Sequence, residues 1–256
     1  MRLIFLNLTA LLYLLCAGLP AQALSLDELR ERGFVTLCVY PNSLPASDQR
    51  GNPPGIHLEL GTEVAAALGV SLKVYWFIPR SRMKAQQCDL GFDEVEGENA
   101  ADYGVAASRP YHRTGVVLLL RDSIKAKRLS EIEAAQRIGV PLGSDAETVL
   151  RARGLSIRSY ALGDEMLAAL ATGELDAAAF PALRVAYEQH SGKLPPYRVL
   201  PIFEEEPKLA WNLVAALRRT DPSVVAAMDG ALSQLMQDGR LAAIYARYGI
   251  RHVEPK

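Results

Sequence analysis

Short apolar runs alternate with helical spacing in the first third of the chain. Runs at 34–40 and 72–78 have the length of strands, and a third run begins at 88. The run at 34–40 is continuous, which is typical of a strand buried on both faces of a parallel sheet. Between these runs, residues 56–68 place apolar side chains at helical spacing, and Gly69 ends the expected helix. The order strand, helix, strand predicts a parallel sheet with right-handed crossovers.

The same alternation returns in the second half, although the residues themselves do not repeat. Strands are expected at 115–120, 138–143, 157–160 and 175–180, and helices at 146–153 and 164–172. This second series of strands and helices predicts a second parallel sheet. The chain is therefore expected to be an α/β protein with two similar units.

A last strand and two helices are expected near the C-terminus. The strand is placed at 209–217, and Asp221 with Pro222 begins a helix, with an acid at the cap and a proline in the first turn. The buried stripe of that helix is expected to be Val225, Met228, Leu232 and Leu235. Gly239 separates it from a final helix that ends at Gly249.

The first residues have the pattern of a cleavable export signal. Arg2 supplies a positive start, and residues 3–15 are almost wholly apolar. Residues 21–23 have the small-x-small pattern that signal peptidase needs, so residues 1–23 are expected to be removed by cleavage after Ala23. The apolar run is shorter than the about 20 residues of a transmembrane helix, and no later run is long enough to anchor the protein. A periplasmic location without a membrane anchor is therefore expected.

Cys38 and Cys88 are the cysteines that remain after this cleavage. The periplasm is oxidising, so a disulfide between them is favoured over the alternative of two buried free thiols. A zinc site is disfavoured, because two cysteines without nearby histidines do not complete a tetrahedral ligand set. The histidines are scattered along the sequence and form no metal-binding or nucleophile pattern. No cofactor is expected.

The net charge of the chain limits the kinds of partner to expect, and its length limits the number of domains. The chain of 256 residues has a formal net charge of -1 at pH 7. This near-neutral charge gives no reason to expect nucleic acid or an anionic membrane as a partner. The length fits one large domain or two modest ones, each able to bury a core.

Three short motifs lie in order along the mature chain. They are Ser108–Gly115, Gly173–Ala177 and Asp238–Gly249. The first resembles the S-x-P-Y-Y-x-T-G segment that leaves the first lobe of family-3 periplasmic solute-binding proteins. The other two are similar to the G-x-x-D-A turn and the C-terminal D-G-x-L-x-x-I-Y-x-x-Y-G of the same family. The resemblance implies the type II periplasmic-binding fold, with two parallel-sheet lobes, a ligand cleft and a two-strand hinge.

The family resemblance also implies how the chain is divided. Residues 24–119 are expected to form the first part of lobe 1, and residues 120–208 are expected to form lobe 2. Residues 209–256 then return to lobe 1. A monomer that binds a small molecule is expected on the same grounds.

Four further segments narrow the resemblance. They are Leu37–Pro45, Tyr75–Arg80, Gln87–Leu90 and Pro195–Pro201. These segments look like the J-type accessory proteins of PQQ-dependent methanol dehydrogenase systems, in which two cysteines fall at matching places. That resemblance implies a periplasmic quinoprotein dehydrogenase as the partner. The chain departs from those proteins after Asp89, where the stretch to Pro110 is several residues longer.

Amino-acid binders of the larger family use three charged devices, and two of them are missing from this sequence. Ala101 stands where those proteins place an arginine that clamps the ligand carboxylate, and Phe180 with Pro181 stands where they place an aspartate for the ammonium. The third device, a Gly143-Ser144 turn at a helix start that binds a carboxylate through N–H groups, is kept. Because a bidentate arginine is a strong contact, its loss disfavours an ordinary amino acid as the ligand.

Candidate ligand contacts are expected in and around the loops that follow the strands, where open α/β sheets bind their ligands. They are Tyr40, Asn42, Trp76, Asp93, Ser108, Gly143, Ser144 and Phe180. Trp76 has core packing as its alternative, and Tyr40 and Asn42 have loop shaping. The acids at 93–98 are interpreted as a solvated loop, with cation contact as the alternative. Arg109 and Arg113 suit an acidic ligand or partner, or are simply exposed bases near a hinge.

Three functions follow from these observations. The first is an accessory protein of a periplasmic PQQ-dependent alcohol or methanol dehydrogenase. The alternative is the substrate-binding protein of an ABC importer, with an ABC permease as partner and a small organic solute as ligand. The third is an enzyme such as a dehydratase of cyclic acids, which needs a carboxylate of raised pKa beside an arginine. Asp93 is the one candidate carboxylate and no such arginine is apparent, so the protein is not expected to be an enzyme.

Overall fold

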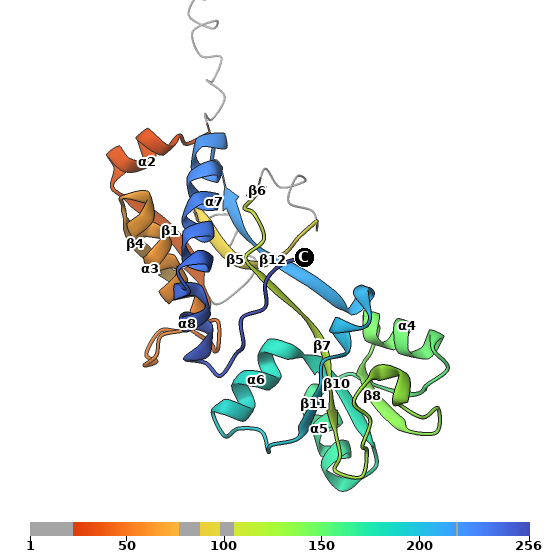
Figure 1. The fold of residues 1–256 in the computed structure, drawn as a ribbon. Helices are drawn as coiled ribbons and strands as arrows, with labels where there is room; N and C mark the ends of the chain where they lie inside the picture. Colours follow the sequence, from red (N-terminus) through yellow and green to blue (C-terminus); the bar gives the residue numbers. More distant parts are fainter. Residues whose placement is uncertain (1–22, 77–87, 98–104, 219) are drawn as a thin grey trace, which may run out of the picture.

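The computed structural model describes residues 23–76, 88–97, 105–218 and 220–256, and Figure 1 shows their arrangement. The helices of the first part are α2 (Leu26–Arg32) and α3 (Ile56–Leu68). Its strands are β1 (Phe34–Val39), β2 (Asn42–Ser43), β3 (Ser47–Asp48), β4 (Ser71–Trp76), β5 (Leu90–Val95), β6 (Val105–Ala107) and β7 (His112–Leu120). Residues 1–22 of the expected signal segment (1–23), the end of the expected strand at 72–78, Glu98 and Ala101 lie outside the described residues.

The part of the chain that follows β7 again alternates strands and helices. Its strands are β8 (Arg137–Pro141), β9 (Ser156–Tyr160), β10 (Ala177–Pro181), β11 (Arg198–Leu200) and β12 (Ala210–Arg218). Its α-helices are α4 (Asp145–Ala152), α5 (Gly163–Thr172), α6 (Ala182–His190), α7 (Pro222–Gln237) and α8 (Arg240–Ala246). Short 3₁₀ turns are η3 (Leu129–Glu131), η4 (Ile202–Glu204) and η5 (Pro207–Leu209).

Two long strands, β7 and β12, join the halves of a single sheet. The strand order is β4-β1-β5-β12-β7-β10-β8-β9. The first half of β7, His112–Gly115, pairs with β12, and the second half, Val116–Leu120, pairs with β10. β7 therefore passes from one half of the sheet into the other after Gly115, and Figure 1 shows it running between the two lobes. The mixed α/β architecture confirms the expected type II periplasmic-binding fold.

Each half of the sheet has a hydrophobic core of its own. One core contains β1, α3, the end of β12, α7 and α8, with Leu37 and Leu60 fully buried. The other contains the second half of β7 together with β8, α4, α5 and β10, with Leu118 and Ile138 fully buried. The separate cores support the expected lobe boundaries near residues 119 and 209, which stay a prediction.

We call the point after Gly115, where β7 passes between the halves of the sheet, the crossing. The carboxyl ends of the parallel strands in both halves point toward it. β1 is parallel to β4 and β5, and β5 is antiparallel to β12, which begins at the crossing. In the other half, β8 is parallel to β9 and β10, and Pro181 at the end of β10 pairs with Val116 beside the crossing. The segments that follow these strands therefore lie on two facing edges of the sheet, which we call the lobe-1 edge and the lobe-2 edge.

Two expectations about burial are wrong in detail. β1 is buried on one face only: Val35, Leu37 and Val39 are buried, and the alternate residues are half-buried. This alternation arises because α3 packs on one side, where its Gly61 lies against the Leu37 side chain. In α7, Met228, Leu232 and Leu235 are buried as expected, but Val224 takes the place of Val225, which is only partly buried.

Candidate functional site

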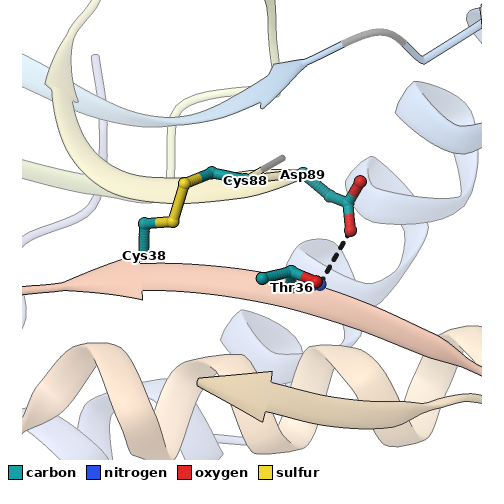
Figure 2. Close-up of a disulfide and its surroundings, with 4 residues drawn as sticks. All are labelled: Thr36, Cys38, Cys88 and Asp89. Carbon is teal, nitrogen blue, oxygen red and sulfur yellow. Dashed lines mark hydrogen bonds between the residues drawn. A yellow bond between two sulfur atoms is a disulfide. The ribbon is translucent and has the colours of Figure 1, made fainter. Parts of the chain in front are cut away.

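A disulfide and a set of polar contacts fasten the start of β5 to β1. Cys38 is bonded to Cys88, with their Cα atoms 5.7 Å apart, which confirms the expected disulfide (Figure 2). Beside it, the Asp89 carboxylate accepts a hydrogen bond from the Thr36 N–H at 2.8 Å, and the Asp89 N–H donates to the Thr36 carbonyl at 3.0 Å. Arg32 donates twice to the Asp89 carboxylate, at 3.3 and 2.7 Å. These contacts fix the position from which β5 runs toward the crossing.

Asp93 occupies a β-bulge near the carboxyl end of β5. Its φ is 62°, and within the described ranges it is the one non-glycine residue with a positive φ. Glu94 lies opposite Val214, but Gly91 lies opposite Ala216, so β5 holds one extra residue relative to β12. A bulge redirects a side chain, and backbone strain of this kind clusters at functional positions. Asp93 is therefore the strongest of the expected site residues.

Two side chains from other elements hold the Asp93 carboxylate. The Nε2 of His57, in the first turn of α3, lies 2.7 Å from Oδ2, and the Tyr111 hydroxyl donates to Oδ1 at 2.9 Å. Burial acts to raise the pKa of Asp93, but the His57 imidazole and the Tyr111 hydroxyl outweigh it, so this pKa is lowered. Asp93 is thus an anion at neutral pH, and 31% of its side chain is exposed.

The other expected residues of the lobe-1 edge are held in different ways. Tyr40 is half-buried, and its carbonyl accepts a hydrogen bond from the Ser47 hydroxyl at 2.7 Å. Asn42 is exposed in the short strand β2. Trp76 packs against the hydrophobic core of this lobe, which favours the core-packing alternative. Ligand contact by Tyr40 and Asn42 stays a prediction.

Ser108 and Phe180 are buried by contacts within the protein. The Ser108 hydroxyl donates to the Arg109 carbonyl at 2.8 Å and accepts from the Ala215 N–H at 2.9 Å. Phe180 is 3% exposed in the core of the second lobe, and the Arg184 guanidinium lies 5.4 Å from its ring centre. Both side chains have structural roles here, and a ligand contact by either of them stays a prediction.

A carboxylate of the chain itself occupies the Gly143-Ser144 turn on the lobe-2 edge. Gly143 has a φ of 73°, and its N–H donates to Glu147 Oε2 at 2.8 Å. The Ser144 N–H donates to the Pro141 carbonyl at 3.2 Å, and its hydroxyl donates to the same oxygen at 2.7 Å. The turn is present as expected, but these donors, which would bind a ligand carboxylate, are already used.

Two further donors keep Glu147 in this position. The Ser159 hydroxyl donates to Oε1 at 2.7 Å, and Arg151 donates to the same atom at 2.9 Å. The hydrogen bonds from Ser159, the Gly143 N–H and Arg151 lower the pKa of Glu147, so its carboxylate stays charged. A second carboxylate at this turn would meet that charge. Ser144 followed by Glu147 has the spacing of a capping box, in which the glutamate would accept from the N–H of the serine cap. The carboxylate instead accepts from the Gly143 N–H, one residue earlier, so the sequence signalled only that Glu147 lies near this turn.

Comparison with known proteins decides the family. Residues 35–251 match the family of bacterial extracellular solute-binding proteins, family 3. The chain belongs to this family. Family-3 proteins act outside the cytoplasm, and among the described helices of this one none is long and apolar enough to cross a membrane. No curated protein matches the chain significantly.

Solved structures share the fold of this family-3 protein at low identity. The L-cystine solute receptor of Neisseria gonorrhoeae, unliganded and open, has a TM-score of 0.76 at 16% identity, over 90% of this chain and 99% of that one. The periplasmic binding protein XoxJ from Methylobacterium extorquens AM1 has a TM-score of 0.63 at 19% identity, over 86% and 100%. An ancestral amino acid-binding protein, a precursor of cyclohexadienyl dehydratase, has a TM-score of 0.59 at 20% identity, over 88% and 98%. These likenesses show the fold alone.

A cluster of aromatic and imidazole rings lies next to Asp93, and the sequence pattern did not reveal it. The His112 ring stacks on Tyr245 with 4.4 Å between centres and lies 5.3 Å from the His252 ring. His252 Nε2 donates to the Tyr111 carbonyl at 2.8 Å. Burial, and then the charge of His252, lower the pKa of His112 to about 3. In the described part of the chain no His, Cys, Asp and Glu side chains gather into a group that could hold a metal.

An open hollow of about 530 Å³ lies beside the crossing segment of β7 in this family-3 protein. Residues of β7, α6, β11 and the chain after α8 line it. The eight expected ligand contacts are all absent from its lining, whereas Arg113 is part of it. Its volume falls within the range of small-molecule pockets, about 300–1,000 Å³.

Proposed function

We propose that this family-3 binding protein is an accessory of a periplasmic PQQ-dependent alcohol or methanol dehydrogenase. The observation that carries the proposal is Glu147, which occupies the third of the amino-acid devices. Because the Glu147 carboxylate already fills the Gly143-Ser144 turn, this turn is not free to bind the carboxylate of an amino acid in the way that the amino-acid binders of the family use it. The Cys38–Cys88 disulfide, at the places where J-type accessory proteins carry cysteines, and the shared fold with XoxJ support the dehydrogenase as partner.

Co-purification and gene deletion test this partnership. The tagged mature protein is expected to retain the dehydrogenase from a periplasmic extract that contains it. Deletion of the gene is expected to lower the dehydrogenase activity of the periplasm, and a plasmid copy is expected to restore it. Unchanged dehydrogenase activity in the deletion strain would contradict the proposal.

The second candidate is the substrate-binding protein of an ABC importer, with an ABC permease as partner and an organic solute that is not an amino acid. The observation in its favour is Asp93, because a bulge holds its charged and partly exposed carboxylate on the lobe-1 edge. A solute that binds the folded protein raises the melting temperature by mass action, so a thermal-shift screen against amines, alcohols and acids is informative. Asp93→Asn is expected to abolish the shift, and Glu94→Gln, a change at its exposed neighbour, to keep it. A screen without any shift counts against import.

Asp93 does not meet the requirement of the enzyme hypothesis. A carboxylic acid that donates a proton near neutral pH needs a raised pKa, whereas His57 and Tyr111 outweigh burial and lower the pKa of Asp93. The partners of its carboxylate within the described residues are an imidazole and a phenol, not an arginine. We therefore propose a binding role and not a catalytic one.

We further propose that the mature protein is a periplasmic monomer that begins at Leu24, after cleavage behind Ala23. The intact mass of protein taken from the periplasm tests the cleavage site, because each alternative N-terminus gives a different mass. Sedimentation of the same sample tests the monomer.

A further inference from the structure

The hollow beside β7 lies where the strand passes from one half of the sheet to the other. Thr114 and Val117, on either side of that passage, both line it. The second lobe contributes α6 and β11, and the first lobe contributes the chain after α8. Figure 1 shows α6 and β11 beside the second half of β7, below the segment that runs from α8 to the C-terminus. A molecule in this hollow would contact both lobes at once.

The lining of the hollow is apolar with basic groups at intervals. Val117 and Val185 are buried, and Val199 of β11 is one of the exposed large apolar side chains, at 36%. Arg113 and Arg251 bring positive charge, and the lining residues include no aspartate and no glutamate. An apolar pocket with a few well-placed polar groups is the usual form of a small-molecule site.

Arg113 is a half-buried cation without a counter-ion among the described residues. Its backbone N–H donates to the Val253 carbonyl at 2.8 Å, which fastens the C-terminal segment to β7. No ion pair or hydrogen bond to its guanidinium is found within the described ranges, whereas Arg251 bridges to Glu204 at 3.1 Å. A partly desolvated charge without a partner is unfavourable, and a bound anion would relieve this.

We infer that the hollow binds a small organic carboxylate with an apolar body. The carboxylate pairs with the Arg113 guanidinium, and the apolar part packs on Val117 and Val199. A neutral molecule would leave Arg113 unpaired, and a cation would face two arginines in a lining without acids. The facing edges of the sheet carry the opposite sign, at Asp93 and Glu147, so this site selects a different class of molecule.

Calorimetric titration of the mature protein with three probes that share a phenylpropyl skeleton and differ in charge tests the inference. The probes are 3-phenylpropionate, its neutral amide, and the cation 3-phenylpropylamine. The carboxylate is expected to bind, the amide to bind about tenfold more weakly, and the amine not to bind, because only the carboxylate forms an ion pair with the Arg113 guanidinium. Binding of the amine as tightly as the carboxylate, or no binding of the carboxylate, overturns the inference.

Matched substitutions locate the site. Arg113→Gln is expected to weaken 3-phenylpropionate about tenfold or more, since one charge-assisted pair is lost. Arg109→Gln is the control, because Arg109 is exposed, donates to Ser233 of α7 and does not line the hollow. Val199→Asp adds a carboxylate to the lining at a partly exposed position and is expected to abolish binding, while Val199→Thr keeps it. If Arg113→Gln and Val199→Asp bind 3-phenylpropionate as tightly as the controls Arg109→Gln and Val199→Thr, the ligand lies elsewhere and the inference is overturned.

Discussion

Asp93 accepts a hydrogen bond from the Tyr111 hydroxyl, and His112 is the next residue in sequence. Both groups make the fold less stable in acid. Burial keeps His112 neutral in the folded protein, with its pKa lowered from 6.5 to about 3, whereas an unfolded histidine accepts a proton below about pH 6.5. Stability from His112 is therefore lost as the pH falls from 6.5 toward 3. Asp93 has a lowered pKa, so its contribution is present above the unfolded value of about 3.9 and is lost as the pH falls below it. The histidine acts over a higher pH window than the aspartate.

We expect His112→Phe to reduce the loss of unfolding free energy between pH 7.5 and pH 4.5. A histidine with a pKa of 6.5 in the unfolded chain and about 3 in the folded protein lowers the free energy of unfolding by about 3 kcal/mol at pH 4.5. Phenylalanine keeps an aromatic ring stacked on Tyr245 and has no group that titrates. Urea denaturation followed by circular dichroism at the two pH values measures the difference. A variant at His112 with the full wild-type pH dependence would contradict this account.

Sequence reasoning found Asp93 but not what holds it. Its partners His57 and Tyr111 lie 36 and 18 residues away, and the positive φ comes from a bulge that exists only when β5 meets β12. The contact of Glu147 with Ser159 spans 12 residues and depends on α4 packing beside β9. Motifs predict which residues stand near the edges of a sheet, whereas partners chosen by tertiary packing are invisible to local patterns.

The disulfide links two elements of the first lobe: Cys38 lies in β1, and Cys88 lies just before β5. We expect the double variant Cys38→Ala, Cys88→Ala to lose up to about 4 kcal/mol of unfolding free energy, since the bond closes a loop between residues 50 apart in sequence. Guanidinium denaturation of the variant and of wild type, each with and without reductant, measures the loss. Reductant is expected to destabilise wild type to the level of the variant and to leave the variant unchanged. Equal stability of oxidised wild type and variant would show that the bond carries no such constraint.

The elements that were predicted correctly have strong periodicity or clear caps. α7 begins at Pro222 after the Asp221 cap, and β8 and β9 follow their apolar runs to within a few residues. The sequence pattern does not predict α6 or β11. α6 fully buries only Val185, so its apolar spacing is weak, and β11 has 3 residues and draws its stability from pairing with β7. Elements stabilised mainly by tertiary contacts leave little trace in local sequence.

Gly115 lies where β7 passes from one lobe to the other, in closely packed surroundings. A Cβ there would overlap the Leu209 carbonyl oxygen and the Phe203 side chain, both in the connection that leads back to β12. We expect Gly115→Ala to lower the free energy of unfolding by about 1–3 kcal/mol, which is typical of overpacking against fixed neighbours. Gly91→Ala on β5 is the matched control, since a Cβ there meets Ala216 at an ordinary 4.0 Å. Thermal and urea denaturation compare the two variants, and equal effects would rule out a special role for the crossing.

At the scale of the whole molecule, the sequence predicted the fold through two routes that agree. The alternation of strands and helices indicated two parallel sheets, and the three motifs implied a two-lobed fold with crossing strands. Neither route predicted the hollow, because it forms where β7, α6 and the C-terminal segment converge from distant parts of the chain. Arg113 was visible as a base near the hinge, but its environment required the assembled structure.

The place of β12 in the sheet also sets an order of assembly. β12 lies between β5 and β7, so the first lobe stays unfinished until the last part of the chain has been delivered. A chain that emerges N-terminus first completes the contiguous second lobe earlier, while β5 waits with an unpaired edge. Unpaired edges recruit strands from other chains. The bond between Cys38 and Cys88 can form before β12 arrives, and it would hold β1 and β5 together during that interval.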